Sequence, residues 1–176
     1  MSTASTALAR LPRRRPVASL VAAVLICEAV GASGSVFTVT GPTSWYATLA
    51  RPALAPPNWV FGPVWTTLFA LMGAGAWLVW RRRALADDGS AAAGRARLAL
   101  GVFALQFAFN VAWSAAFFGA RSPAAGLVVI AVLWVLIAAT IRAFAAVDWR
   151  AAALLVPYLA WVSFAAYLNY GIWRLN

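Results

Sequence analysis

Long apolar runs, separated by short polar or proline-rich segments, dominate the chain. Five runs each come close to the roughly 20 residues that a helix needs to cross a hydrocarbon core of roughly 30 Å. We expect them to span a membrane at residues 17–39, 59–80, 98–118, 124–144 and 151–173. The runs do not alternate between apolar and polar residues, which favours helices over barrel strands because a helix satisfies its own backbone hydrogen bonds in lipid. The pattern therefore predicts an all-α membrane protein, a five-transmembrane-helix bundle.

The first 16 residues differ from these runs. They are rich in Ser, Thr and Ala and hold two prolines and four arginines, a composition typical of a disordered basic arm. The run that follows is too long for a cleaved signal sequence, and no small-residue cleavage pattern ends it. We therefore divide the chain into a disordered arm at 1–16 and a membrane domain at 17–176.

The connections between the runs are unequal. The longest, at 40–58, holds four prolines and the aromatic pair Trp45 and Tyr46, more than a passive tether requires, and we interpret it as a lid. The connection at 81–97 combines acids, a glycine and arginines and predicts a solvated turn.

Composition and charge agree with a lipid environment. The chain is 64% hydrophobic and 10% charged, and its net charge of +10 results from 14 arginines, no lysine and four acids. The arginines lie at the ends of apolar runs and do not alternate with stacking aromatics, which excludes nucleic acid as a partner. Eleven lie on the side of the N-terminus and three on the other side. The positive-inside rule therefore predicts a cytoplasmic N-terminus, and the arginine-rich composition favours a bacterial cell membrane.

The residue types that are missing limit the chemistry. With no histidine and one cysteine, Cys27, the chain can form neither an internal disulfide nor a Cys/His metal site nor a histidine-based triad. No acid and base pair appears, so we expect a binding protein without catalytic residues or an obligatory cofactor. Glu28, midway along the first run, must be protonated, paired or exposed to a wet cavity.

The third run has two different faces. Ala104, Ala108, Ala112 and Ala116 lie within about 120° of one another on a helix and form an alanine ladder. Small residues allow helix backbones to approach closely in lipid. We interpret the ladder as the interface of a homodimer; packing inside one bundle is the alternative.

The opposite face of this run is polar and aromatic. It carries Gln106, Asn110, Trp113 and Phe117, and amides at mid-span are costly unless they are hydrogen-bonded or line a cavity. We place these residues in the bundle interior, where they contact a ligand or one another.

Two further runs carry aromatic stripes that could form the walls of the same pocket. On the fifth run, Tyr158, Trp161, Ala165 and Leu168 share a face, and on the second run Phe61 and Trp65 do so. Trp65, Trp113 and Trp161 lie deeper than interface tryptophans such as Trp149.

Several motifs, in order along the chain, resemble the TspO/translocator family. They are WYATLARP at 45–52, PPNWVFGPVWT at 56–66, NVAWS at 110–114, FFGAR at 117–121, PYLAW at 157–161 and LNY at 168–170. The resemblance extends from the first connection to the C-terminus.

The resemblance implies a five-helix bundle, often dimeric, with a pocket under the first loop. Such pockets bind porphyrins, haem-pathway intermediates and hydrophobic drug-like molecules, so a porphyrin or haem is the implied ligand. Combining the helix faces with the family motifs, we expect the ligand to contact Trp45, Phe61, Trp65, Gln106, Asn110, Trp113, Tyr158, Trp161, Ala165 and Leu168.

Three functions fit these expectations. The first is a membrane sensor or regulator that binds a tetrapyrrole between indole side chains. The second is a transporter of porphyrin, sterol or another lipid-like ligand. The third, implied by the resemblance alone, is a light-dependent porphyrin-degrading activity.

Overall fold

The computed structural model describes residues 11–176. Residues 1–10 of the expected basic arm lie outside the described residues, and residues 11–14 are helical. The disorder expected for the arm therefore stays a prediction.

Five long helices make up the described part of the chain, and no strand occurs in it. They are α2 (Pro16–Ser33), α4 (Phe61–Leu85), α5 (Ala91–Ser114), α6 (Pro123–Ala145) and α7 (Trp149–Leu175). With the short turns that extend some of them, the helices are long and apolar enough to cross a membrane at Pro16–Val36, Asn58–Leu85, Ala91–Gly119, Pro123–Ala145 and Trp149–Leu175. The prediction of an all-α, five-helix membrane protein is confirmed.

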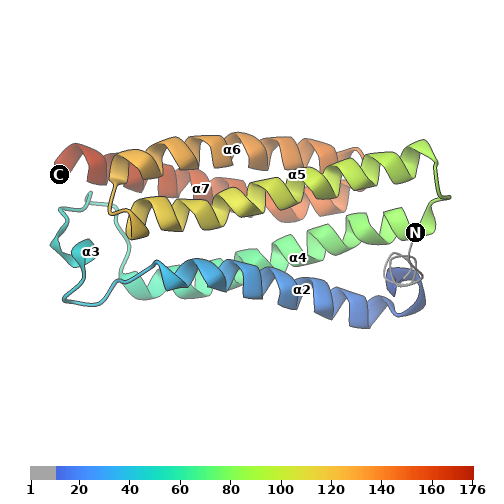
Figure 1. Cartoon of the computed structure of the whole chain (residues 1–176), viewed down its shortest axis with the longest axis horizontal. Helices are drawn as coiled ribbons and strands as arrows, with labels where there is room; N and C mark the ends of the chain where they lie inside the picture. The colour runs from blue at the N-terminus through green and yellow to red at the C-terminus, as the bar shows by residue number, and fades with distance from the viewer. Residues whose placement is uncertain (1–10) are drawn as a thin grey trace.

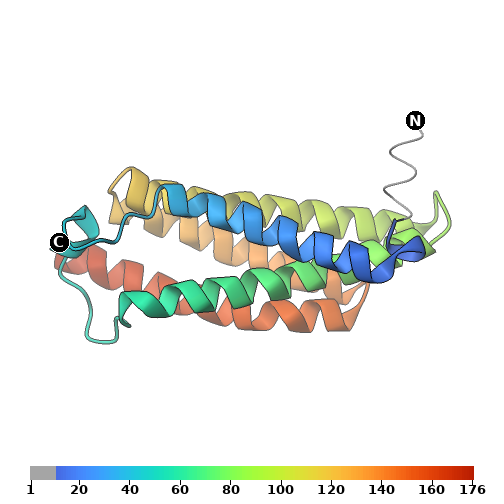
Figure 2. The same cartoon turned by 90° about the horizontal axis from the view of Figure 1, so that it is seen from below.

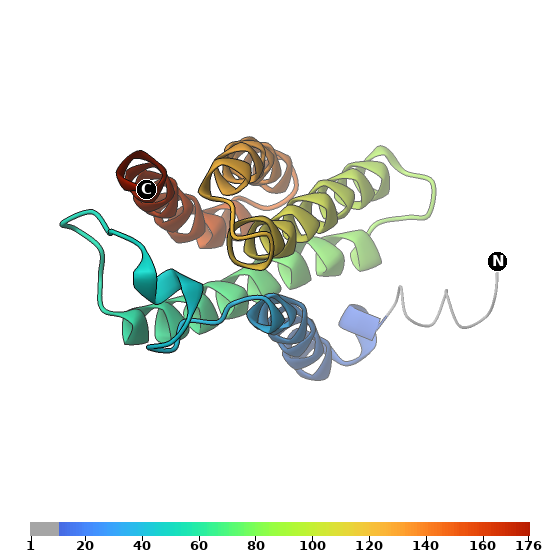
Figure 3. The same ribbon diagram turned by 60° about the vertical axis from the view of Figure 1, so that its left-hand side comes forward.

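The helices form one elongated bundle with α4 at its centre. Helix α4 packs against α2, α5 and α7, while α6 packs against α5 and α7. Helix α2 lies on the outside, makes most of its contacts with α4, and touches α5 only near one end (Figures 1 and 3). The connection between α2 and α4 lies at the same end of the bundle as the C-terminus.

Two helices extend further than the apolar runs predict. The expected turn at 81–97 is reduced to residues 86–90, because α4 continues to Leu85 and α5 begins at Ala91. Arg82 and Arg83 occupy the last turn of α4, where cations complement the helix dipole. Ser90 caps α5 by accepting the amide of Ala93 at 3.2 Å. Hydropathy marks the part of a helix inside lipid, and these solvated ends were therefore missed.

Glycines on opposite sides of α4 bring it into close contact with its neighbours. A Cβ atom on Gly73 would lie 2.7 Å from the Val24 Cα atom of α2, and one on Gly75 would lie 3.2 Å from the Ala151 carbonyl oxygen of α7. From the Gly73 contact, α2 and α4 diverge toward the end that holds α3 (Trp45–Thr48) (Figure 2). The bundle therefore opens between these two helices at the end that holds α3.

The loop at residues 37–57 lies across the open end. Its C-terminal part is held by Asn176, which donates to the Ala50 carbonyl and accepts the Ala50 amide, both at 3.1 Å. Pro52 packs so closely on Gly171 of α7 that a Cβ atom there would lie 2.9 Å from the proline ring. The position agrees with the interpretation of this segment as a lid.

The alanine ladder of α5 faces away from the bundle. Ala104, Ala108 and Ala112 are exposed and Ala116 is partly exposed. The alternative to a dimer interface is that the ladder packs inside a single bundle. Among the described residues, the structure does not show such packing.

The contact at Gly73 generates a prediction about stability. Gly73→Ala should push α2 away from α4, because backbone atoms of α2 occupy the space that a methyl group needs. Overpacking of this kind costs about 1–3 kcal/mol, measurable as a lower melting temperature in mild detergent. Gly101→Ala is the matched control, since nothing lies within 4 Å of its added Cβ. Equal melting temperatures for the two variants would contradict the close approach.

Candidate functional site

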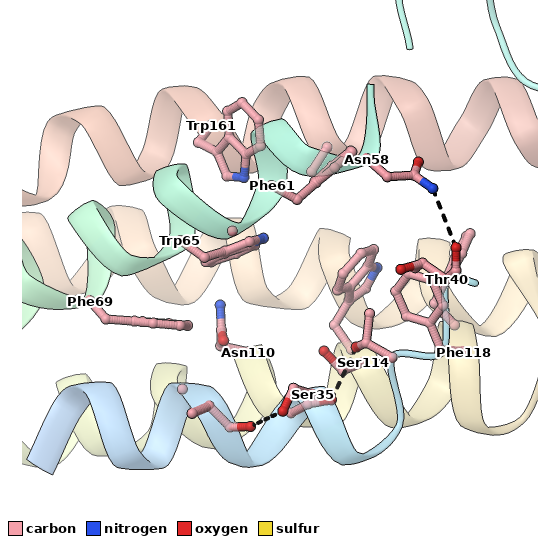
Figure 4. Close-up of a pocket in the computed structure, with 18 of the residues that line it drawn as sticks. Ser35, Thr40, Asn58, Phe61, Trp65, Phe69, Asn110, Ser114, Phe118 and Trp161 are labelled. Carbon is pink, nitrogen blue, oxygen red and sulfur yellow. Dashed lines mark hydrogen bonds between the residues drawn. The ribbon is translucent and has the colours of Figure 1, made fainter. Parts of the chain in front are cut away.

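A cavity of about 380 Å³ lies between α2, α4, α5 and α7 at the open end of the bundle. Its size falls in the range of small-molecule sites, roughly 300–1,000 Å³. The walls are mostly apolar, and Figure 4 shows side chains of several helices converging on the cavity. The aromatic residues of the lining are Tyr46, Phe61, Trp65, Phe69, Trp113, Phe117, Phe118 and Trp161.

Aromatic pairs hold the walls in place. Phe61 meets Trp161 edge to face across α4 and α7, with ring centroids 5.8 Å apart. Trp65 stacks on Phe69 within α4 at 5.3 Å. Such pairs contribute about 0.5–1.5 kcal/mol each beyond the burial of their surface, so the rings are positioned before any ligand binds.

A wider helical turn shapes the end of the cavity wall that α5 forms. Residues Ala115–Gly119 form a π-helix that continues α5, in which the Ala120 amide bonds to the Ala115 carbonyl at 2.8 Å. Phe117 and Phe118, adjacent in sequence, both line the cavity. Single π-turns inside α-helices are frequently found at functional sites.

A buried chain of hydrogen bonds supports Asn110 from behind. Its side-chain amide donates to the Tyr158 hydroxyl at 2.9 Å, and that hydroxyl donates to the Gln106 side-chain oxygen at 3.2 Å. Tyr158 and Gln106 are fully buried. The chain joins α5 to α7 and orients Asn110, the one of the three that lines the cavity.

Trp113 is oriented by a second polar link. Its indole N–H donates to the Asn169 side-chain oxygen at 3.1 Å, and the Asn169 amide donates to the Pro123 carbonyl at 2.8 Å. One side chain of α7 thereby connects α5 with the start of α6, and it fixes the plane of an indole in the wall.

The indole N–H of Trp161 differs from that of Trp113. The nitrogen is buried and has no hydrogen-bond partner in the structure, although its residue lines the cavity (Figure 4). A buried donor without an acceptor costs about 1–3 kcal/mol. A ligand with an acceptor atom at this position would remove that cost.

Helix α2 and the 3₁₀ turn Gly34–Val36 that continues it provide the fourth wall with one stripe of residues. Glu28, Gly31, Ala32 and Ser35 follow the i, i+3, i+4, i+7 spacing of a helix face and all line the cavity. The lack of a side chain at Gly31 accommodates the Phe69 ring, which occupies the space that a Cβ atom would need. The wall is otherwise made of small residues, so Glu28 is its main chemical feature.

The mouth of the cavity lies under the loop. Asn58 donates to the Thr40 carbonyl at 3.4 Å (Figure 4). Arg51 donates to the Asn58 side-chain oxygen at 3.1 Å. The Arg51 guanidinium also lies over the Tyr46 ring, 5.7 Å from its centroid. Arg51 does not itself line the cavity, and neither do the other arginines of the described residues.

The structure brings together most of the ligand-binding residues expected from the sequence. Seven of the ten line the cavity, namely Phe61, Trp65, Asn110, Trp113, Trp161, Ala165 and Leu168. The other three lie behind the lining: Gln106 and Tyr158 support Asn110, and Trp45 packs edge-on against Phe117 at 5.9 Å. Tyr46, next to Trp45, lines the cavity instead.

Sequence reasoning missed the whole wall that α2 provides. The small residues Gly31 and Ala32 resemble ordinary membrane-helix residues, and only their helical spacing from Glu28 marks a shared face. That spacing was the signal that could have identified this wall.

Known relatives cover nearly the whole chain. The sequence signature of the TspO/MBR family matches residues 23–174. The tryptophan-rich protein TspO of Chlorobaculum tepidum is 46% identical over 167 residues, covering 92% of this chain and 98% of its own. The human translocator protein is 42% identical over 143 residues, 81% of each chain. The tryptophan-rich sensory protein of Cereibacter sphaeroides is 38% identical over 148 residues, covering 84% of this chain and 87% of its own.

Proposed function

The chain belongs to the TspO/MBR family, and we propose that it binds a tetrapyrrole in the cavity beneath the 37–57 loop and acts as a membrane sensor or regulator. The observation that carries the proposal is the set of aromatic side chains on the cavity walls, contributed by three helices and the loop. A flat, apolar macrocycle gains both buried area and offset stacking between such rings.

Polar atoms of the cavity support the same ligand class. The unpaired indole N–H of Trp161 suits an acceptor on the ligand. Arg51 stands at the mouth, beside Asn58 and Tyr46. Peripheral carboxylates of a tetrapyrrole would reach this guanidinium while the ring system stays between the helices.

Names of relatives support two different roles. One relative is called a sensory protein and another a translocator protein. Transport of the ligand is therefore the second candidate. The cavity is confined to the half of the bundle near the loop, where its lining on the helices begins at Glu28, Phe69, Asn110 and Trp161. A ligand held at one end favours binding over passage, and flux into sealed vesicles tests the alternative.

Trp161 provides the test of the binding site. Trp161→Phe should weaken binding of protoporphyrin about tenfold, because it removes the indole N–H and part of the stacking area, together worth about 1–2 kcal/mol. Quenching of the remaining tryptophan fluorescence in detergent measures the affinity. Trp149→Phe is the matched control, since Trp149 is 70% exposed and lies at the far end of α7. If both variants bound protoporphyrin equally weakly, the ligand would not occupy this cavity.

We also propose that the protein is a homodimer whose two copies contact each other through the alanine ladder of α5. Ala108→Leu with Ala112→Leu should give monomers in mild detergent, because bulky side chains keep the two helices apart. Val128→Leu on the exposed surface of α6 is the control and should leave the dimer intact. Light scattering measures the mass. A dimer that survived both ladder substitutions would exclude this interface.

The proposed orientation places the N-terminus in the cytoplasm of a bacterial cell and the 37–57 loop outside. In a Cys27→Ala background, a membrane-impermeant maleimide added to intact cells should label Leu54→Cys in the loop. It should label Asp87→Cys, between α4 and α5, only after lysis. Both side chains are exposed, so access to the reagent depends on the side of the membrane. The reverse labelling pattern would invert the topology.

A further inference from the structure

Glu28 is the one acid among the residues that line the cavity in the described part of the chain. It lies within the membrane-spanning helix α2, one turn beyond the contact between Val24 and Gly73, where the cavity begins. Its neighbours on the same helix face are Gly31, against which the Phe69 ring packs, and Ala32, whose small side chain leaves the cavity open.

No hydrogen bond or ion pair engages the Glu28 carboxyl group within the described part of the chain. Burying a carboxyl group among apolar atoms without a partner is costly. Two amide side chains of the lining do have partners: Asn110 bonds to Tyr158, and Asn169 bonds to Trp113 and Pro123. Glu28, which is partly buried, lines the cavity without such a bond.

The charge of the lining defines which ligand group fits there. The lining holds one carboxyl group and neither an arginine nor a lysine, while Arg51 bonds to Asn58 and lies over the Tyr46 ring at the mouth. A hydrogen-bond donor or a cation would be stabilised at Glu28, whereas an anion would be repelled. The two ends of the cavity therefore prefer opposite groups.

We propose that Glu28 recognises a group that donates hydrogen bonds or carries a positive charge, an amine above all, on the aromatic ligand that the cavity holds. The proposal rests on the proposed function, because it requires that the cavity binds a ligand. It adds a direction: the nitrogen-bearing part of the ligand lies inward at Glu28, and acidic groups lie outward near Arg51.

Two fluorescent probes of matched shape test this recognition. Pyrenylmethylamine and pyrenylmethanol share a planar aromatic system and differ only in the head group. Their binding to the protein in a neutral detergent is measured by energy transfer from tryptophan. The wild-type protein should bind the amine about tenfold more tightly than the alcohol, the usual scale of one charge-assisted hydrogen bond.

Two variants on the same stripe of the lining, one in α2 and one in the 3₁₀ turn that continues it, identify the residue. In Glu28→Gln the preference for the amine should fall below about twofold while the affinity for the alcohol changes little, which also shows that this variant is folded. Ser35→Ala is the matched control, because it alters a polar lining residue without changing charge, and it should keep the preference. A preference for the amine that persisted in Glu28→Gln would overturn the proposal.

The wild-type protein alone separates this proposal from the proposed function. If pyrenylmethanol bound and protoporphyrin displaced it, but the amine bound no more tightly, the cavity would be a ligand site and the role of Glu28 would be excluded. If neither pyrene probe nor protoporphyrin bound, both proposals would be overturned.

Discussion

The approach of α2 to α4 at Gly73 is the contact on which the cavity depends. Two helices that touch through their backbones at one level must separate elsewhere if they cross at an angle, and here they separate toward the 37–57 loop. Phe69 fills the first gap by packing against Gly31, and the space beyond it is left open. Without a glycine at the crossing, α2 would lie farther from α4 along its whole length. The cavity therefore follows from the same close packing that membrane helices use to associate.

Polar groups at mid-membrane position the side chains of the cavity wall. Asn110, Trp113 and Asn169 line the cavity, and they are bonded to one another or to Tyr158, Gln106 and the Pro123 carbonyl behind the lining. A lipid environment offers these groups no water, so each must be satisfied inside the bundle. The result is a wall whose rings and amides are fixed before a ligand arrives, which lowers the ordering cost of binding.

The spans and part of the site were predictable from the sequence because hydropathy and helical phase depend on local spacing. On each helix, the expected residue lies on the same face as neighbouring aromatic or small residues, as for Trp161, Trp65 and Asn110. Seven expected residues line the cavity. The helix face alone could not distinguish a residue that lines the cavity from one that lies behind the lining, as Tyr158 and Gln106 do. The α2 wall depends on a crossing point between two helices, and the choice of Tyr46 over Trp45 depends on the path of a loop. Neither is encoded in the periodicity of a single segment.

Helix α5 has two functional faces, and their separation bears on how a sensor of this shape could work. Asn110 and Trp113 face the cavity, whereas Ala108 and Ala112 face outward. In the proposed dimer the ladder would meet a second copy without covering the cavity, so ligand binding and association would not compete for surface. Any coupling between them would pass through α5 itself, whose π-turn at Ala115–Gly119 carries Phe117 and Phe118 in the lining. A ligand that displaced these rings would act on the one irregular turn of the helix, where the backbone can adjust without losing the regular hydrogen bonds of Ala91–Ser114.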